Sequence, residues 1–420
     1  MTVDADIMGL GRHGDGMARI EGRTVAVPFT LPDERVRLAG EPPALAAVLR
    51  SSKDRVTPPC RHFGRCGGCQ LQHMDRNALL EWKRGRVVSA LHREGVEASV
   101  DKTVGCEPHS RRRAVFSATR SGGELILGFR ARGTDEIVPM VECHVLVPAI
   151  VDALPDLRAV AATALAGSAP ISLTVTACEN GLDVAIATGR PATDDTLSAL
   201  VRVASRAGIV RCTVNATVAM EQAAPVVRFG DAAVVPPPGA FLQAVEETEA
   251  RMAQLVTDHL AGSGRVADLF AGSGTFALRL ARTTPVDAFE SDAAALQALA
   301  DGADASAGLR KVATQVRDLF AEPLIVPELK PYDALVLDPP RAGAAAQAAQ
   351  LAKAKVPRLA YVSCNPETMA RDLSVLTKRT YRIERVVPLD QFLWTPHVEV
   401  VALLTLRDGD AARPRRSIFR

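Results

Sequence analysis

Apolar positions in the last part of the chain alternate between strand-like and helix-like periods. From about residue 265 onward, short apolar runs such as RVADLF, YDALVLD and RLAYVSC are separated by segments long enough for a helix. Buried parallel strands give near-continuous apolar runs of this kind, and helices connect them. The last two runs, YRIERVV and EVVALLTL, are joined by a loop too short for the crossover that parallel pairing needs. The pattern therefore predicts an α/β fold with a Rossmann-like doubly wound sheet whose final strand is antiparallel.

Two further regions precede this sheet. The first fifty residues hold short alternating segments, at 25–29 and 35–38, with glycines between them, which is typical of a small OB-like β-barrel. A helical period runs through residues 76–93, and β-rich segments follow, with a helix near 149–166. The sequence Pro-Pro-Pro-Gly at 236–239 ends this region. We predict three domains: a barrel at residues 1–50, a central α+β domain at 51–238 and the sheet domain at 239–420.

Composition excludes several classes of protein. The chain has 50 Lys and Arg against 48 Asp and Glu, and 47% hydrophobic residues, which is ordinary for a globular protein rather than a disordered or fibrous one. No window approaches the roughly 18 apolar residues of a membrane helix, and the N-terminus lacks a secretory pattern, so we expect a cytoplasmic protein without a membrane segment. Residues 53–132 carry a basic excess that includes Arg111–Arg113. A solvated face is the simplest explanation, but an excess of this size favours contacts with phosphates.

A glycine-rich turn follows the first strand of the predicted sheet. In DLFAGSGTFA, Gly272 and Gly274 permit a tight turn and a close approach of a ligand to the backbone. Glu290 ends the next strand, where an acid suits the two hydroxyls of a ribose. The pattern fits a nicotinamide dinucleotide as well as S-adenosylmethionine (SAM), so it predicts a nucleoside site without choosing the nucleoside. Asp318, after the third strand, is either an acceptor for an adenine amino group or a solvated strand end.

Three polar motifs end or begin later strands. Asp338 precedes two prolines that forbid helix and ladder, which holds its carboxylate at the edge where open α/β sheets bind ligands. Cys364 enters a polar turn, SCNP, at the same edge, which favours a nucleophile over a core residue. Glu399 begins the antiparallel strand, so it is predicted beside Asp338 and Cys364. A carboxylate before the apolar run VVALLTL must be partnered or functional, and the presence of Cys364 favours catalysis.

Four cysteines form a candidate metal site. Cys60, Cys66 and Cys69 fall within ten residues, and Cys143 is a candidate fourth ligand. Four thiolates in a tetrahedral arrangement suit zinc and a [4Fe–4S] cluster alike. A chance cluster of free thiols is the less favoured alternative. Eight cysteines are too few for a disulfide scaffold in a chain of 420 residues, so we expect a reducing compartment.

Together these motifs resemble the bacterial SAM-dependent RNA uracil-5-methyltransferase family, in particular its iron–sulfur branch that modifies 23S rRNA. The resemblance covers nearly the whole chain, from a TRAM-like barrel through the cysteine cluster to DPPRAG, SCNPETMARDL and HVEVVALL. It implies that Cys364 is the nucleophile, that Glu399 accepts a proton, and that the four cysteines hold a [4Fe–4S] cluster. It also implies a pocket for SAM and uracil that is lined by Gln243, Phe270, Gly272, Gly274, Thr275, Glu290, Asp318 and Asp338. At Val245 the chain departs from the family, which usually has Asn there.

Other functions stay open at this point. A tRNA uracil-5-methyltransferase shares the chemistry, although its branch typically lacks the four cysteines. A nicotinamide-dependent oxidoreductase leaves SCNP and HVE unexplained, and a non-catalytic iron–sulfur RNA-binding factor leaves Cys364 and Glu399 unexplained. RNA is the expected partner, with 23S rRNA ahead of tRNA. A target base flipped out of its stack needs an aromatic neighbour, and Phe392 and Trp394 are candidates that would suit the protein core equally well.

Overall fold

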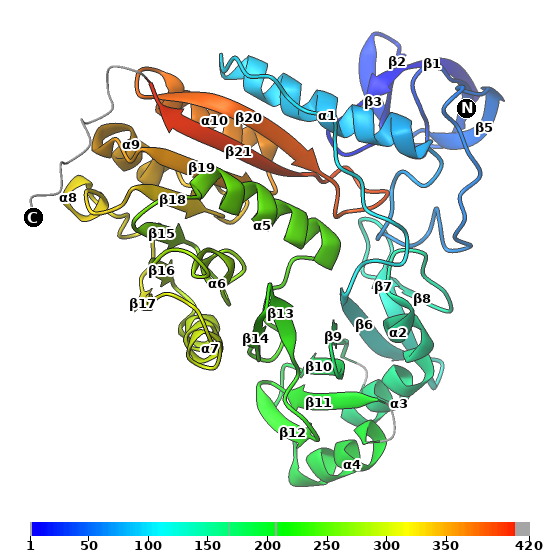
Figure 1. The fold of residues 1–420 in the computed structure, drawn as a ribbon. Coiled ribbons are helices and arrows are strands. Elements are labelled where there is room, and N and C mark those ends of the chain that lie inside the picture. The colour runs from blue at the N-terminus through cyan, green and yellow to red at the C-terminus, as the bar shows by residue number, and fades with distance from the viewer. Residues whose placement is uncertain (1, 168, 206–207, 408–420) are drawn as a thin grey trace, which may run out of the picture.

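The computed structural model describes residues 2–407 apart from residues 168, 206 and 207. It contains an N-terminal sheet, a central sheet and a large C-terminal sheet (Figure 1). The N-terminal sheet is antiparallel, in the order β3-β2-β1-β4-β5. Its strands are β1 (Thr2–Leu10), β2 (Gly16–Ile20), β3 (Arg23–Val27), β4 (Arg35–Ala39) and β5 (Ala44–Arg50). Alternate side chains such as Ile7, Ala18 and Leu38 form its small core, as a strand period of two requires.

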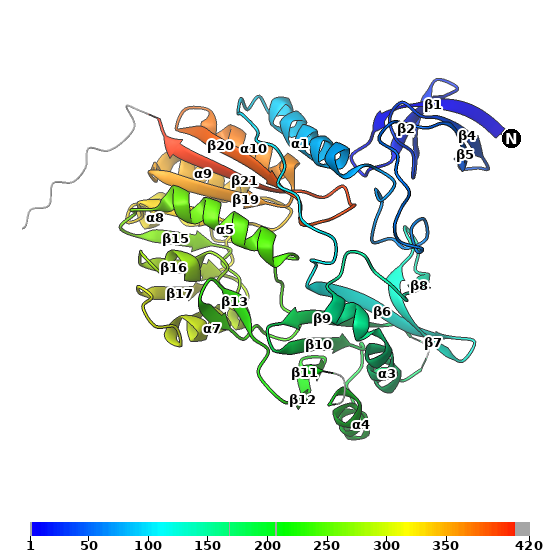
Figure 2. The ribbon, with the colours of Figure 1, turned by 45° about the vertical axis from the view of Figure 1, so that its right-hand side comes forward.

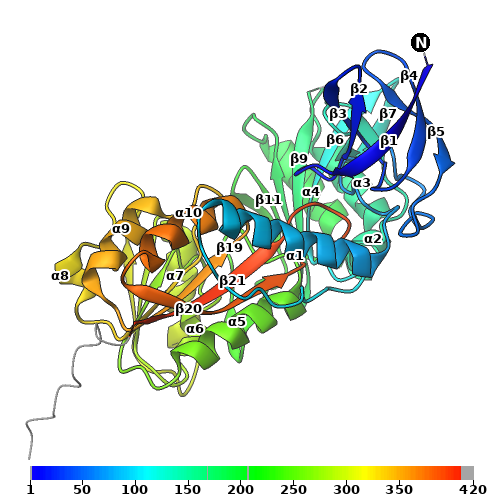
Figure 3. The same ribbon diagram turned by 90° about the horizontal axis from the view of Figure 1, so that it is seen from above.

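Helix α1 (Arg76–Arg93) joins this region to the far end of the chain. Its N-terminus is capped by Asp75, whose carboxylate accepts hydrogen bonds from the N–H groups of Asn77 and Ala78. Figure 3 shows the helix lying along the C-terminal sheet beside β20 and β21. Val87, Ala90 and Leu91 of the helix belong to the same core cluster as that sheet. An early segment of the chain therefore supports the region where the last strands meet.

The central region is a seven-stranded sheet covered by helices, as Figure 2 shows. Its strand order is β12-β11-β10-β9-β6-β7-β8, and only the pair β10–β11 among these is parallel. The strands are β6 (Arg113–Ser121), β7 (Glu124–Arg130), β8 (Ile137–Pro139), β9 (Ile171–Cys178), β10 (Gly181–Ala187), β11 (Ile209–Val214) and β12 (Thr217–Glu221). The helices are α2 (Pro148–Asp152), α3 (Leu154–Ala164) and α4 (Asp194–Ala204), and a hairpin of β13 (Val227–Phe229) and β14 (Ala232–Val234) follows.

The C-terminal sheet has the order β17-β16-β15-β18-β19-β21-β20. Strands β15 to β19 are parallel, and β21 runs antiparallel to both of its neighbours, as the short loop before it predicts. Its strands are β15 (Val266–Leu269), β16 (Val286–Glu290), β17 (Val312–Val316), β18 (Ala334–Leu337), β19 (Arg358–Ser363), β20 (Tyr381–Leu389) and β21 (Glu399–Leu406). Strand order reverses between β15 and β18, the place where doubly wound sheets bind ligands.

Helices cover both faces of this sheet. Residues of α5, α6 and α7 form a core with one face, and residues of α1, α9 and α10 form a second core with the other. The helices are α5 (Glu246–Leu260), α6 (Ala277–Leu280), α7 (Ala293–Asp304), α8 (Val326–Leu329), α9 (Ala345–Ala354) and α10 (Pro366–Thr377). In the described part of the chain, no helix combines the length and apolar character that crossing a bilayer requires. The predicted α/β sheet with its antiparallel final strand is thus confirmed.

Candidate active site and cysteine pocket

The carboxylate of Glu290, at the end of β16, lies against the backbone of the glycine turn that follows β15. Phe270, Gly272 and Gly274 have φ angles of 64°, 54° and 105°, the left-handed region that favours glycine. At Gly274 a Cβ would also lie 2.9 Å from two leucine side chains, so only glycine fits there. Glu290 accepts a hydrogen bond of 3.0 Å from the N–H of Gly272, and its second oxygen accepts from the N–H groups of Ser291 and Asp292, directly before α7. One carboxylate therefore fixes the turn at the ribose side of the predicted nucleoside site.

Other predicted cofactor residues surround the same edge of the sheet. Asp318 is exposed, and its carboxylate accepts from the backbone N–H of Phe320 in the loop after β17. The ring of Phe320 lies 5.4 Å from that of Phe270. Thr275 is partly buried where the turn enters α6. Asp268, a member of the glycine motif that the sequence reasoning left out of the site, is fully buried, and burial and the charge of Asp338 raise its pKa well above the usual range.

An unbroken chain of hydrogen bonds joins two carboxyl groups through two glutamines. Gln243 Nε2 donates to Asp338 Oδ2 at 3.2 Å, and Gln391 Nε2 donates to Gln243 Oε1 at 2.6 Å. Gln391 Nε2 also donates to Glu399 Oε1 at 2.9 Å, and Gln391 Oε1 accepts from the N–H of Ala244 at 2.8 Å. Gln243, Gln391 and Glu399 are all buried. The order of the chain is therefore Asp338, Gln243, Gln391, Glu399.

Cys364 lies at the same place, at the end of β19. In the antiparallel pair of β19 and β21, Ser363 is opposite Val400, so Cys364 and Glu399 are the next residues on the two sides. Burial raises the pKa of the Cys364 thiol to about 12, and the charges of Glu399 and Asp338 contribute. These charges act on Cys364 because all three groups lie close together, so the structure brings the three predicted residues into one site.

The turn that carries Cys364 is fixed to the loop after β18. Asn365 caps α10 by accepting from a backbone N–H of its first turn, and its Nδ2 donates to the carbonyl of Arg341 at 2.9 Å. The hydroxyl of Thr368 donates to the same carbonyl at 3.1 Å. Ser363 Oγ accepts from the N–H of Asn365 at 3.1 Å. The sulfur therefore precedes the N-terminus of a helix, where the helix dipole favours a thiolate, and the positive charge of Arg341 acts on it in the same direction.

The two carboxyl groups of the site are unusually basic. Burial raises the pKa of Glu399 to about 8, and the charge of Asp338 adds to this effect. Burial likewise raises the pKa of Asp338 to about 7, against the hydrogen bond that Gln243 donates. Groups that titrate this close to neutral pH can accept and release protons during a reaction, which ordinary carboxylates do poorly.

The loop between β20 and β21, residues 390–398, is anchored from the early part of the chain. Lys83 of α1 is fully buried and donates to Asp390 Oδ1 at 2.6 Å and to the carbonyl of Phe392 at 3.0 Å. The carbonyl of Trp394 accepts hydrogen bonds from the N–H groups of Gln70 and Leu71, each at 2.9 Å. Gln391 therefore reaches the site from a loop that is held in place by α1 and by residues 60–71, the segment of Cys60, Cys66 and Cys69 that is called the cysteine loop below.

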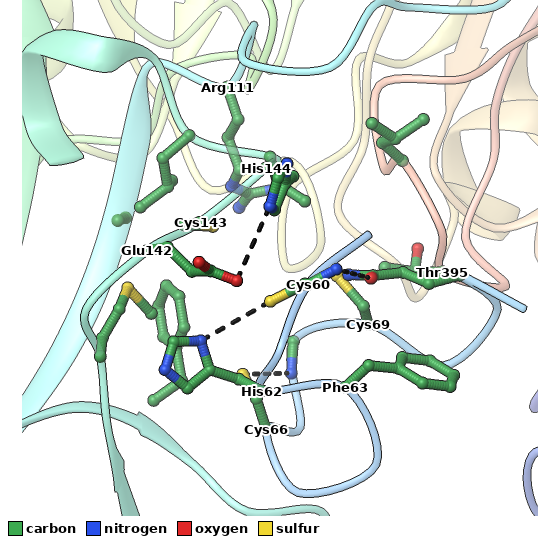
Figure 4. Close-up of a pocket in the computed structure, with 18 of the residues that line it drawn as sticks. Cys60, His62, Phe63, Cys66, Cys69, Arg111, Glu142, Cys143, His144 and Thr395 are labelled. Atoms are coloured by element: carbon green, nitrogen blue, oxygen red, sulfur yellow. Dashed lines mark hydrogen bonds and ion pairs between the residues drawn. The ribbon is translucent and has the colours of Figure 1, made fainter. Parts of the chain in front are cut away.

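The four predicted cysteines line one cavity of about 380 Å³. Figure 4 shows Cys60, Cys66, Cys69 and Cys143 around this space. Burial raises the pKa of each thiol, that of Cys69 to about 12. The neighbouring thiols add to this effect at Cys66, Cys69 and Cys143, and the charge of Glu142 adds to it at Cys60. The donor atoms of Cys60, His62 and Glu142 lie within 4.8 Å of one another, with Cys60 Sγ and His62 Nδ1 3.6 Å apart. The pocket therefore offers four sulfur donors with a histidine and a carboxylate beside them.

One wall of this cavity is the loop that also supplies Gln391. The loop residues Phe392, Leu393, Thr395 and His397 line it, together with Arg111 of the central region. Residues at the two ends of the same loop, Gln391 and Glu399, belong to the carboxyl–amide chain. The cysteine pocket and the sheet edge that carries Cys364, Glu399 and Asp338, called the catalytic edge below, thus share the loop at residues 390–398.

Two predictions about RNA contacts need correction. Arg112 is buried, and its guanidinium pairs with Glu249 Oε2 at 2.6 Å and donates to the carbonyl of Gln243, so it holds the central region against α5 and cannot face phosphate. Trp394 is only 5% exposed within a hydrophobic cluster, so it cannot stack on a flipped base. Phe392 is partly buried, and its ring lies edge-on to His397 at 5.7 Å. Of the run Arg111–Arg113, Arg112 therefore serves packing rather than phosphate contact.

Sequence reasoning missed Gln391 and the pair of Lys83 and Asp390. A signal for Lys83 existed, because it falls on the helical face of Leu79, Val87 and Leu91, where an unpaired charge is costly. No comparable signal marks Gln391, since its partners at 243 and 244 are distant in sequence.

Comparisons with known proteins give consistent matches. The family model for tRNA (uracil-5-)-methyltransferase matches residues 308–407, and the TRAM domain model matches residues 1–38. An uncharacterized RNA methyltransferase of Brucella suis is 47% identical over 96% of this chain and 98% of its own length. One of Mesorhizobium japonicum is 46% identical over 99% of this chain and 100% of its own length.

A relative with an assigned activity and a solved structure extend these matches. The 23S rRNA (uracil(1939)-C(5))-methyltransferase of Chromohalobacter salexigens is 34% identical over 96% of this chain and 89% of its own length. The crystal structure of Pyrococcus abyssi tRNA (uracil-54, C5)-methyltransferase in complex with S-adenosyl-L-homocysteine superposes with a TM-score of 0.74. It is 24% identical and covers 96% of this chain and 100% of that chain, so it supports the fold.

Proposed function

This chain belongs to the RNA uracil-5-methyltransferase family, and on that premise we propose that it converts uridine to 5-methyluridine in 23S rRNA, with SAM as the methyl donor. The observation that carries the proposal is the meeting of Cys364 with Glu399 and Asp338 at the carboxyl edge of a doubly wound sheet. The relative of Chromohalobacter salexigens supports 23S rRNA as the substrate. No disulfide joins any of the eight cysteines, all of which lie in the described part of the chain, and we place this activity in the reducing cytoplasm.

The edge beside the glycine turn suits the methyl donor. Glu290 would accept from the ribose hydroxyls, and Asp318 from the adenine amino group. Phe270, Gly272, Gly274 and Thr275 would form the wall of the SAM site that faces the turn. Gln243 donates to Asp338, whose charge acts both on Asp268 of the glycine motif and on Cys364, so we place uracil beside these two side chains. Asp338 can accept the N3–H of uracil, which cytosine lacks.

The chemistry follows from the weakness of uracil C5 as a nucleophile. When the Cys364 sulfur loses its proton and bonds to C6, the C5=C6 electrons move into an enolate. C5 would then attack the methyl group of SAM, the methyl–sulfonium bond would break, and S-adenosylhomocysteine would leave as a neutral thioether. C5 now carries both the methyl group and its original hydrogen. Glu399 takes that proton, the C–H electrons restore the C5=C6 bond, and the C6–S electrons return to Cys364 as thiolate. The positive charge of Arg341 is placed to stabilise the thiolate and the enolate.

Charge coupling in the site suits this order of events. The carboxylates of Glu399 and Asp338 disfavour the Cys364 thiolate, so a free thiolate is costly here and the thiol proton has to pass to solvent as the sulfur bonds to C6. Once the sulfur has formed a neutral thioether, that repulsion is gone, so Glu399 can release its own proton to solvent and then act as the base for the C5 proton. With a pKa of about 8, Glu399 can do both within the neutral range.

We also propose that Cys60, Cys66, Cys69 and Cys143 hold a [4Fe–4S] cluster. Four thiols that converge on one cavity match the all-sulfur donor set of such a cluster, which also holds the thiolates against the burial that disfavours them. A mixed zinc site of Cys60, His62 and Glu142 is the alternative that the geometry also offers. Methyl transfer from SAM moves no net electrons, so we assign the group a structural role.

RNA would approach over the N-terminal TRAM domain and the cysteine loop. The TRAM match covers the first strands, and Arg61 and Arg65 of the cysteine loop are exposed. Such contacts would position the RNA by its phosphates, while the target base is flipped out to reach Cys364. Phe392, partly buried at the edge of the loop, remains the candidate aromatic neighbour.

The proposed function is tested by methylation of 23S rRNA and tRNA transcripts with labelled SAM. We expect label in 5-methyluridine of 23S rRNA and none with Cys364→Ala, which cannot form the C6–S bond. Glu399→Gln is expected to methylate once and to remain covalently attached to the RNA, because the C5 proton cannot leave. Label in tRNA instead would assign the second candidate, which the name of the matching family model favours. Equal activity of Cys364→Ala would contradict the mechanism, and an inactive but RNA-binding protein would contradict the enzyme assignment.

A further inference from the structure

Gln391 lies in the site, and the mechanism proposed above assigns it no role. Its side chain is 1% exposed, and its amide makes three hydrogen bonds: two N–H donors go to Glu399 Oε1 and Gln243 Oε1, and its oxygen accepts from the N–H of Ala244. The backbone N–H of Ala244 needs an acceptor, so it fixes which end of the amide is oxygen. The –NH2 group must therefore face Glu399 and Gln243.

Glu399 depends on this one amide. Its carboxyl group is 3% exposed, and among the described residues Gln391 is its only side-chain hydrogen-bond partner. Gln243 in turn donates to Asp338, so the amide pair holds the two acids in a fixed relation to each other. A donor to a buried carboxylate stabilises its charged form, which is the form that accepts a proton.

We propose that Gln391 is a positioning residue for proton removal from C5, which holds the Glu399 carboxylate in its accepting orientation and ties it to Gln243 on the uracil side of the site. The inference rests on the proposed function, since it concerns the step that follows methyl transfer. In that step the C5–H bond breaks, the proton moves to a Glu399 oxygen, the C5=C6 bond forms, and the C6–S bond breaks to release the Cys364 thiolate.

The position of the loop explains how one side chain can serve this step alone. Gln391 enters beside Asp390, which is held by Lys83, so the loop stays anchored when the Gln391 amide is removed. Cys364 and the SAM edge belong to other strands and make no hydrogen bond to Gln391 among the described residues. Because Gln391 also donates to Gln243 on the uracil side, its substitution should change bond formation by Cys364 and methyl transfer by a few-fold at most, and should slow the loss of the C5 proton much more.

The test compares tritium release from RNA that carries 5-tritiated uridine with methyl transfer from labelled SAM in single turnovers. For Gln391→Met we expect methyl transfer within a few-fold of the unsubstituted enzyme, and tritium release slower by on the order of tenfold. Covalent enzyme–RNA adduct should accumulate, and the pH at which tritium release is half-maximal should move upward, because the base has lost its donor. Gln347→Met is the matched control: Gln347 is also 1% exposed and bonds the backbone of Leu324, outside the site.

Several outcomes separate the inference from the proposed function. If Gln391→Met keeps the ratio of tritium release to methyl transfer and the pH profile of Gln347→Met, the inference is overturned while the function stands. If Gln391→Met does not fold, Gln391→Glu keeps the shape and the bond from Ala244, and in its ionised form, at alkaline pH, it has no donor for Glu399, so the same delay is expected there. If Cys364→Ala still transfers methyl groups, the proposed function fails and the inference falls with it.

Discussion

At the scale of the residue, the site has carboxyl groups that are costly to keep ionised. Glu399, with a pKa of about 8, and Asp338, with a pKa of about 7, titrate where most glutamates and aspartates are fully charged. The cost of removing Glu399 from water is only partly offset by the donor from Gln391. Such a residue should make the folded protein less stable as it ionises.

This reasoning predicts how stability depends on pH. Between the ordinary glutamate pKa and about 8, the folded protein holds the Glu399 proton and the unfolded chain has lost it. Stability therefore falls as pH rises through this window and levels off above it. In Glu399→Gln the fall from pH 5 to 8.5 should be smaller by about 4 kcal/mol, at about 1.4 kcal/mol per pKa unit. Urea unfolding at several pH values measures this difference.

A matched acid outside the site provides the control for that measurement. The pKa of Glu384 is lowered by the hydroxyl of Thr405 and by Arg382, so it is ionised throughout the window in both states. Glu384→Gln should leave the slope between pH 5 and 8.5 unchanged. A slope in Glu399→Gln equal to that of the unsubstituted protein would show that Glu399 titrates normally.

At the scale of the element, the loop between β20 and β21 depends on the buried pair of Lys83 and Asp390. Both side chains are inaccessible to water, at 0% and 2% exposure, and 307 residues separate them in the sequence. Removing one member leaves a buried charge without its partner, which typically costs about 3–5 kcal/mol. The pair is therefore the strongest single link between α1 and the catalytic edge.

We expect Lys83→Met and Asp390→Asn each to lower the free energy of unfolding by about 3–5 kcal/mol. The ion pair of Arg385 and Asp101 joins β20 to the segment that follows α1, and 48% and 32% of these side chains are exposed at the surface. Asp101→Asn should therefore lower the free energy of unfolding by less than about 1 kcal/mol. Urea denaturation of the three variants measures these losses in the free energy of unfolding. Equal losses would mean that the buried pair contributes no more than an exposed one.

The elements differ in how far the sequence could predict them. Asp338, Cys364 and Glu399 could be placed together because each stands at a strand end on one edge of a sheet that the apolar runs predict. The glutamine chain could not, because an amide in a loop has no periodicity and its partners come from distant segments. The prediction that the run with Arg112 contacts phosphate was wrong at Arg112 for the same reason. The charge of Arg112 is visible in the sequence, but its buried partner Glu249 is not.

At the scale of the whole molecule, the cysteine loop, the loop before β21 and the catalytic edge form one continuous structure. The domain limits at 50/51 and 238/239 remain a prediction, and α1 packs against the C-terminal sheet across the second of them. The cavity of the four cysteines shares its wall with the loop of Gln391, whereas the glycine turn and Glu290 lie at other strands. Loss of the cysteine site should therefore disturb RNA binding and proton removal more than SAM binding.

Substitution of one cysteine tests this separation. Protein purified without oxygen should contain iron and sulfide in equal amounts, and Cys66→Ser should lose most of both, since changes at a metal site weaken binding by about 10–100-fold. We expect Cys66→Ser to melt at a lower temperature and to bind 23S rRNA more weakly, while its affinity for SAM stays within about threefold. Cys178→Ser, which removes a partly buried thiol on β9 far from the cavity, is the control. Normal melting and RNA binding in Cys66→Ser would exclude the structural role, and stoichiometric zinc without iron would replace the cluster by a zinc site.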